Sequence, residues 1–184
     1  QAVNVGETVA GRKLVLVKDS TIWKFKCRAE LTVTDTHLAQ RTQLEATEDV
    51  DLKLLYYFMH CFVPTTTRWI AELPDGDLVE GTLAGDGGFE VNKDTRWVAQ
   101  FEPARTLGFL CYSPKVISGP GSASRIWDLA RYHKFYYQAN AQRSFKRGET
   151  LDYQVLVQVV PQETGDWSAT KAAAEDLKRA FPPL

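Results

Sequence analysis

The feature that most constrains the fold is a succession of short segments in which apolar and polar side chains alternate, separated by turn residues. In residues 22–33, for example, Trp23, Phe25 and Cys27 alternate with basic side chains. Strict period two is the pattern of a half-buried β-strand, because successive side chains face opposite sides of the sheet. Helical periodicity does not separate these segments, so the pattern argues against a parallel sheet built from βαβ units.

The densest segment, residues 52–63, has apolar or aromatic side chains on both of its faces. We expect it to form one central strand that is packed on both sides. Two hairpins are predicted further along the chain. The first turns at residues 74–77 (PDGD), where Pro fixes φ and Gly accepts a positive φ, and the second turns at residues 102–105 (EPAR).

Only the end of the chain has helical spacing. Ala169, Ala173 and Leu177 recur on one side of a helix, and Asp166 precedes them as a candidate N-cap. We therefore predict an α-helix over about 167–181. With the preceding strands, this gives an all-β fold: an antiparallel β-sandwich with one C-terminal α-helix.

Length and composition bound the class of protein. A chain of 184 residues, 44% of them hydrophobic, is long enough to bury a core as a single domain (1–184) without disulfide or metal support. The net charge of −1 argues against a nucleic-acid partner, and the longest apolar run, residues 54–59, is too short to cross a membrane. The cysteines Cys27, Cys61 and Cys111 are odd in number and match no zinc-ligand spacing, so we expect no metal and no cofactor.

The chain begins at Gln1, without a Met and without the basic and apolar regions of a signal peptide. This start is compatible with a processed periplasmic or secreted protein, with a trimmed chain and with a fragment of a longer chain. We expect a soluble protein, and its compartment and its oligomeric state stay open.

Basic residues gather between residues 125 and 147, where the only acidic residue is Asp128. This basic strip consists of Arg125, Arg131, Lys134, Arg143, Lys146 and Arg147. One interpretation is a binding surface for acidic sugars or for the carboxylates of another protein. The other is a solvated strand edge whose cations prevent edge-to-edge aggregation.

Two of the three histidines, His60 and His133, lie in aromatic segments that are predicted to be strands. An imidazole can act as a general acid or base near neutral pH. Aromatic rings interleaved with polar groups also suit a sugar, which offers an apolar C–H face and a rim of hydroxyl groups. Each histidine is equally compatible with a hydrogen-bonded core residue, and His37, in a polar segment, is interpreted as a surface turn residue.

A cation and several indoles are candidates for ligand contacts. Arg68 and Trp69 follow three threonines at the end of the strand that carries His60, where loops usually hold binding groups. Trp97 and Trp127 would also serve as stacking platforms, although the large apolar area of any Trp suits the core as well.

A series of short motifs resembles one family. In chain order the motifs are Tyr57-Phe58-Met59-His60, Thr66-Thr67-Arg68-Trp69-Ile70-Ala71, Leu73-Pro74-Asp75-Gly76, Glu80-Gly81-Thr82, Gly87-Gly88-Phe89, Arg96-Trp97-Val98-Ala99, Arg131-Tyr132-His133-Lys134 and Gly148-Glu149. Their succession resembles the carbohydrate-active β-sandwich domains of the galactose mutarotase-like superfamily, over about 100 residues.

The resemblance implies a supersandwich-like fold that binds a sugar in its concave face. Epimerases of the superfamily use histidines and a glutamate to protonate the ring oxygen and to deprotonate the anomeric hydroxyl, and many relatives are accessory domains of polysaccharide lyases or hydrolases. Full supersandwiches have more residues than 184, which suggests a truncated member, and no glutamate of this chain aligns with the catalytic one. The residues that the resemblance and the patterns together nominate are His60 and His133 as catalytic groups, with Arg68, Trp69, Trp97, Lys134 and Tyr136 as ligand-binding groups.

The alternative hypothesis is a non-catalytic module for protein interaction or assembly, which would use the basic strip or an open sheet edge. The position of His60 relative to His133 distinguishes the two. The carbohydrate hypothesis expects both imidazoles in one concave groove lined by Trp69 or Trp97.

Overall fold

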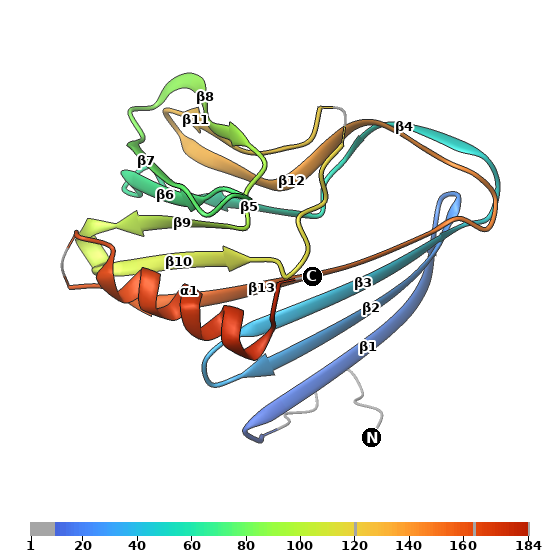
Figure 1. The fold of residues 1–184 in the computed structure, drawn as a ribbon, viewed down its shortest axis with the longest axis horizontal. Helices are drawn as coiled ribbons and strands as arrows, with labels where there is room; N and C mark the ends of the chain where they lie inside the picture. The colour runs from blue at the N-terminus through green and yellow to red at the C-terminus, as the bar shows by residue number, and fades with distance from the viewer. Residues whose placement is uncertain (1–9, 120, 164, 184) are drawn as a thin grey trace.

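The computed structural model describes residues 10–119, 121–163 and 165–183. Two antiparallel sheets pack face to face, and the C-terminal α-helix lies against the outer side of the larger sheet (Figure 1). The predicted fold class, an all-β sandwich with one C-terminal helix, is confirmed.

The large sheet has eight strands in the order β1-β2-β3-β13-β10-β9-β6-β7. Every neighbouring pair in it is antiparallel. Its strands are β1 (Lys13–Ile22), β2 (Phe25–Thr34), β3 (Leu38–Ala46), β6 (Arg68–Glu72), β7 (Leu78–Thr82), β9 (Trp97–Glu102), β10 (Leu107–Tyr112) and β13 (Thr150–Pro161).

The small sheet has five strands, and its long strand β12 pairs with β11 on one side and with both β4 and β5 on the other. The strand β8 pairs with β11 at the far edge. These strands are β4 (Val50–Leu55), β5 (Phe58–Phe62), β8 (Asp86–Lys93), β11 (Ala123–Leu129) and β12 (Tyr132–Phe145).

Both predicted hairpins are present as β6–β7 and β9–β10, the second turning through a 3₁₀ helix, η1 (Pro103–Arg105). The expectation of one strand through residues 22–33 is wrong, because the chain reverses between Ile22 and Phe25. Trp23, with φ of 51°, occupies a turn position instead of a strand face. Local alternation did not reveal this turn, because it contains neither Gly nor Pro.

The segment 52–63 does not form one central strand. It is divided into β4 and β5, which follow one another along the same edge of β12. At the break, the Tyr57 ring turns inward, and its hydroxyl donates to Asn140 Oδ1 at 2.5 Å. Facing the break, Gln138 on β12 has a φ of 48°, which interrupts the pairing. Both new strands therefore lie at an edge, with much of their surface exposed.

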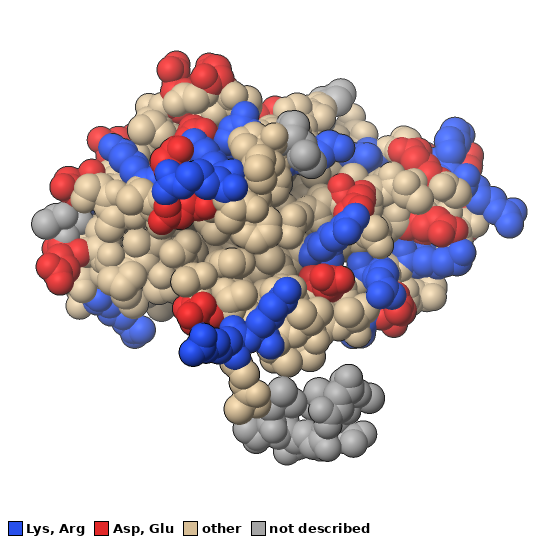
Figure 2. Space-filling model, turned by 60° about the horizontal axis from the view of Figure 1, so that its bottom comes forward, with Lys and Arg blue, Asp and Glu red and all other residues tan. Residues whose placement is uncertain are grey.

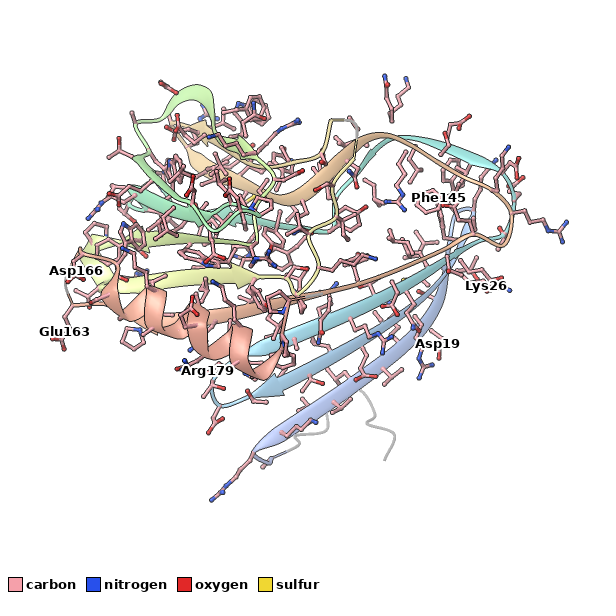
Figure 3. All side chains as sticks on the ribbon, in the orientation of Figure 1. Asp19, Lys26, Phe145, Glu163, Asp166 and Arg179 are labelled. Atoms are coloured by element: carbon pink, nitrogen blue, oxygen red, sulfur yellow. The ribbon has the colours of Figure 1, made fainter. Side chains whose placement is uncertain are left out.

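Two apolar layers hold the fold together. The first lies between the sheets and includes the fully buried rings of Phe135 and Tyr137. At one end of this layer, Phe145 of β12 packs edge-on against Phe25 of β2 with their centroids 5.2 Å apart, as the labelled Phe145 side chain in Figure 3 indicates.

The second apolar layer lies between the large sheet and the helix α1 (Ser168–Ala180), which matches the predicted 167–181 within two residues. Ala173, Ala174 and Leu177 of α1 are buried against this face of the sheet. The N-cap of α1 is Trp167, with φ of 64°, and not the predicted Asp166. Asp166 lies one residue earlier and accepts hydrogen bonds from the backbone N–H and the hydroxyl of Ser168.

The inner layer yields a stability prediction. Phe135→Ala should lower the free energy of unfolding by about 3–5 kcal/mol, because the ring is fully buried and its loss leaves a cavity. Urea denaturation followed by tryptophan fluorescence measures the change. Phe89→Ala is the matched control, since that ring is 55% exposed and its loss should change the free energy of unfolding by less than about 1 kcal/mol. If both variants lowered the free energy of unfolding by the same amount, the assignment of Phe135 to the inner face would be contradicted.

Candidate functional site

His133 is buried in the inner layer. Its Nδ1 lies 2.7 Å from Oδ1 of Asp128, and its Nε2 lies 3.4 Å from the carbonyl oxygen of Pro64. The other oxygen of Asp128 accepts the backbone N–H groups of Ala84 and Gly85, at 2.7 and 2.9 Å. This carboxylate therefore ties β11 to β12 and to the loop before β8. His133 and Asp128 are therefore placed to make a structural contact inside the sandwich.

His60 lies on the same face of the small sheet as His133. It belongs to the edge strand β5, where its side chain is exposed. Its ring is stacked on Phe109 of β10, with centroids 5.7 Å apart and planes at 9°, and it meets Phe62 edge-on at 4.9 Å. Within residues 10–119, 121–163 and 165–183, no side chain or backbone group makes a hydrogen bond or an ion pair with this imidazole. A histidine that serves as a general base is normally oriented by a second polar group, whereas the contacts of His60 with the described residues are to the rings of Phe58, Phe62 and Phe109.

A small cleft opens beside these rings, between β5 and β10. It is lined by Phe62, Phe109 and Gln100, and its volume of about 140 Å³ would hold only four or five water molecules at about 30 Å³ each. Among the described residues, no group hydrogen-bonds to the buried amide of Gln100 or to the neighbouring indole N–H of Trp69. Small-molecule sites usually occupy about 300–1,000 Å³, so the cleft is undersized for a sugar.

The two predicted stacking platforms Trp69 and Trp97 face opposite sides of the large sheet. Trp69 belongs to the layer between the sheets, while Trp97 belongs to the layer beneath α1, where its Nε1 donates to Glu72 at 2.7 Å. Arg68 lies over the ring of Trp167, and its guanidinium donates to the carbonyl oxygen of Gly165 at 2.5 Å. These three predicted ligand-binding residues are not brought together.

Lys134 and Tyr136 do lie together, on the outer face of the small sheet. The Lys134 ammonium lies 5.0 Å from the centroid of the Tyr136 ring, and Tyr56 stacks on that ring at 4.8 Å with an interplanar angle of 28°. The hydrogen bond with Tyr136 raises the pKa of Lys134 above its ordinary value. The ammonium is therefore charged throughout the neutral range.

A second pair of rings continues this surface across the sheet. Phe89 of β8 faces Trp127 of β11, and Trp127 in turn faces Lys134 of β12, so the three side chains form one cross-strand row. The rings of Phe89 and Trp127 are stacked, with centroids 5.8 Å apart, and the indole N–H donates to the carbonyl oxygen of Gly87 at 3.1 Å. Phe89 is 55% exposed.

We call this region the aromatic surface. It consists of two stacked ring pairs on either side of a lysine, together with an exposed methionine from β5. Its members are Tyr56, Met59, Phe89, Trp127, Lys134 and Tyr136. Three of them, Trp127, Lys134 and Tyr136, are sequence-predicted candidates. Met59 and Phe89 join them through the register of β5 and β8, and Tyr56 through its stacking on Tyr136.

The basic strip does not form one continuous patch. Arg125 donates to Asn92 Oδ1 at 2.8 Å, Arg143 donates to the Tyr57 hydroxyl at 2.9 Å, and Lys146 is paired with Asp49. Lys134 is the member of the strip that lies among the rings of the aromatic surface.

A larger hollow, of about 670 Å³, lies on the helix side of the large sheet over β1, β2, β3 and β13. Its charged groups are held in ion pairs: Arg28 with Asp19, Lys26 with Glu45, and Asp152 with Arg41. Figure 2 shows positive and negative side chains intermingled on this side of the molecule, and Figure 3 labels Asp19 and Lys26. A ligand there would have to displace existing ion pairs, which makes the hollow a weaker candidate than the aromatic surface.

The expected arrangement of His60, His133 and the two tryptophans around one concave groove is therefore not what the structure has. His60 and His133 share the inner face of the small sheet, but one imidazole is exposed at the margin and the other is sealed. Among the described residues, no group of three His, Cys, Asp or Glu side chains is placed to hold a metal ion. In the same part of the chain, no helix has the length and apolar character needed to span a membrane.

No protein-family model matches the sequence, and no curated protein does. Solved structures do match the fold. A galactose mutarotase-like protein from Lactobacillus casei aligns with a TM-score of 0.51 at 11% identity, over 83% of this chain and 71% of that one. The Slr1438 protein from Synechocystis sp. PCC 6803 aligns with a TM-score of 0.47 at 11% identity, over 86% of this chain.

The alignment with the Lactobacillus casei protein confirms the expected resemblance as a likeness of fold. The chain spans 65% of the length of the Synechocystis protein, so it corresponds to only part of that structure.

The contacts of Asp128 predict a structural role. Asp128→Ala should lower the free energy of unfolding by about 2–4 kcal/mol, because two backbone N–H groups and a buried imidazole lose their partner. Asp77→Ala, in an exposed turn, is the control and should cost less than about 0.5 kcal/mol. Chemical denaturation measures both. An Asp128→Ala protein of unchanged stability would contradict the structural assignment.

Proposed function

We propose that this chain is a carbohydrate-binding domain that holds a glycan on the aromatic surface of the small sheet. The single observation that carries the proposal is the pair of ring stacks, Phe89 with Trp127 and Tyr56 with Tyr136, on either side of Lys134. The exposed members of the surface are Phe89, Met59 and Tyr56, at 55%, 47% and 39%, while Tyr136 is covered by Tyr56 and Lys134. Exposed apolar area on a folded protein usually marks a binding surface.

The chemistry of the aromatic surface suits a sugar chain. A pyranose places its C–H face on an aromatic ring, and its hydroxyl groups remain free to accept hydrogen bonds from a neighbouring donor. Tyr and Trp supply large contact area with few rotatable bonds, so little conformational entropy is lost on binding. Lys134 adds a cation between the two stacks, which favours a glycan that carries carboxylate groups.

Three features favour binding over catalysis. His133 is sealed in the core, and its carboxylate partner Asp128 already holds two backbone N–H groups. His60 is exposed, but its contacts with the part of the chain that the structure describes are to the rings of phenylalanines. The aromatic surface itself contains no carboxylate that could act as a general acid or base. The fold likeness to a galactose mutarotase-like protein supports the sugar class of ligand, without supplying a reaction.

Affinity electrophoresis in gels containing polygalacturonate tests the proposal. Trp127→Ala should weaken binding about 5- to 30-fold, which corresponds to the 1–2 kcal/mol of a central aromatic contact. Trp23→Ala is the matched control, because Trp23 is 67% exposed and also lies beside a lysine, Lys24, but in the distant β1–β2 turn. The Trp23→Ala protein should bind polygalacturonate as tightly as the wild-type protein does.

A second arm of the same experiment examines the charge. Lys134→Gln should weaken binding to polygalacturonate about 2- to 5-fold and leave binding to a neutral galactan unchanged. Absence of binding to every acidic and neutral polysaccharide tried, or equal losses in the Trp127 and Trp23 variants, would refute the proposal.

Cys61 provides an independent test, because it lies beside Lys134 in the cross-strand register and its thiol is exposed. Bound polygalacturonate should slow alkylation of Cys61 by iodoacetamide several-fold. Cys27 is half-buried on β2 and serves as an internal reference whose alkylation should not change, while Cys111 is buried. Mass spectrometry of the alkylated peptides gives both rates in one sample, and equal protection of Cys27 and Cys61 would count against the site.

A further inference from the structure

The strand β1 is an open edge of the large sheet. Over the described ranges of the chain, it pairs with β2 alone, in an unbroken antiparallel register from Lys13 to Ile22. An edge strand presents backbone N–H and C=O groups that can pair with another strand. Natural edges are usually short, bulged, interrupted by proline or lined with charged side chains. β1 has ten residues without a bulge or a proline, and its charges are Lys13, Lys18 and Asp19.

The middle of β1 is also apolar and exposed. Val15, Leu16 and Val17 are 45%, 43% and 47% exposed. Because side chains alternate along a strand, Val15 and Val17 lie on one face of the sheet and Leu16 lies on the other. Apolar side chains on both faces of an open edge are what a partner strand would cover.

We propose that two copies of this chain associate through antiparallel pairing of β1 with β1, so that the two large sheets become one continuous sheet. The proposed register places Leu16 of each copy opposite Leu16 of the other. In that register Val15 of one copy faces Val17 of the other, and Lys13 faces Asp19. The two-fold symmetry repeats each of these contacts.

Charge selects this register over its neighbours. Moving the pairing by one two-residue step toward the N-terminus sets Arg12 of each copy opposite Lys18 of the other, which brings like charges together. One step the other way sets Val15 opposite Asp19. The proposed register pairs valine with valine and lysine with aspartate along one face, and opposite charges directly across a ladder are favourable.

Asp19 is available for this contact. Its side chain is 69% exposed although both carboxylate oxygens accept hydrogen bonds from Arg28, at 3.0 and 2.9 Å. A carboxylate has lone pairs for further donors, so an ammonium arriving from the second copy adds to the existing pair without breaking it. Figure 3 shows Asp19 at the side of the sheet formed by β1 and β2.

Charge reversal in sedimentation equilibrium tests the pairing, with the full chain at about 1–200 μM. The wild-type chain should form a dimer in this range. Lys13→Asp and Asp19→Lys should each weaken dimerisation at least 10-fold, because each creates two like-charge contacts. The double variant restores opposite charges between the copies. Because Asp19→Lys also removes the Arg28 ion pair within each copy, recovery is judged against the Asp19→Lys single variant, and the double variant should dimerise at least 5-fold more tightly than that single variant.

Lys18→Asp is the matched control, since it makes the same charge change in the same strand at a position that would face Leu14. It should alter the dimerisation constant by less than about 3-fold. A wild-type chain that is monomeric at all concentrations, a double variant that does not recover, or a Lys18 variant as weak as the Lys13 variant would overturn the proposal. Polygalacturonate binding by the same variants is a separate readout, so failure of the dimer and failure of the glycan site are distinguishable.

Discussion

The inward packing of three side chains of β12 is the constraint on which the rest of the molecule depends. His133, Phe135 and Tyr137 point into the space between the sheets and are almost wholly excluded from solvent. Since side chains alternate along a strand, Lys134 and Tyr136 lie on the opposite face, where Tyr56 and Lys134 cover the Tyr136 ring. The same pleat that builds the core therefore presents the aromatic surface, and a one-residue shift of β12 would exchange the two faces.

Local patterns predicted the fold well where turn chemistry was explicit. The hairpin at residues 74–77 and the terminal helix follow from Pro-Gly turns and helical spacing, which are short-range effects. Residues 52–63 show the limit of such patterns. Their apolar character on both faces predicted a central strand, whereas the chain breaks there because Tyr57 packs inward and donates to Asn140, 83 positions away in sequence. Such a partner is invisible to local periodicity.

The candidate site was less predictable than the fold, for a related reason. Periodicity shows that residues two positions apart share a face, but only the packing of the sheets decides which face is buried. Trp69 and Trp97 were equally plausible platforms, and both proved to be core residues on opposite sides of one sheet. Trp127 became part of a surface because β8 and β11 pair so that Phe89 faces it, a register that composition does not specify.

The aromatic surface and the β1 edge belong to different sheets, yet they are linked by symmetry. A two-fold axis that relates two antiparallel β1 strands runs perpendicular to the joined sheet and keeps each face of that sheet on the same side. Both small sheets would then lie on one side of the joined sheet, with their aromatic surfaces facing the same way. Two weak sites on one rigid body can engage a single long glycan, and such linkage raises the overall affinity by about 10²–10⁴ when the spacing permits both contacts. Self-association would therefore convert a shallow, open surface into an effective polysaccharide binder without any change in the site itself.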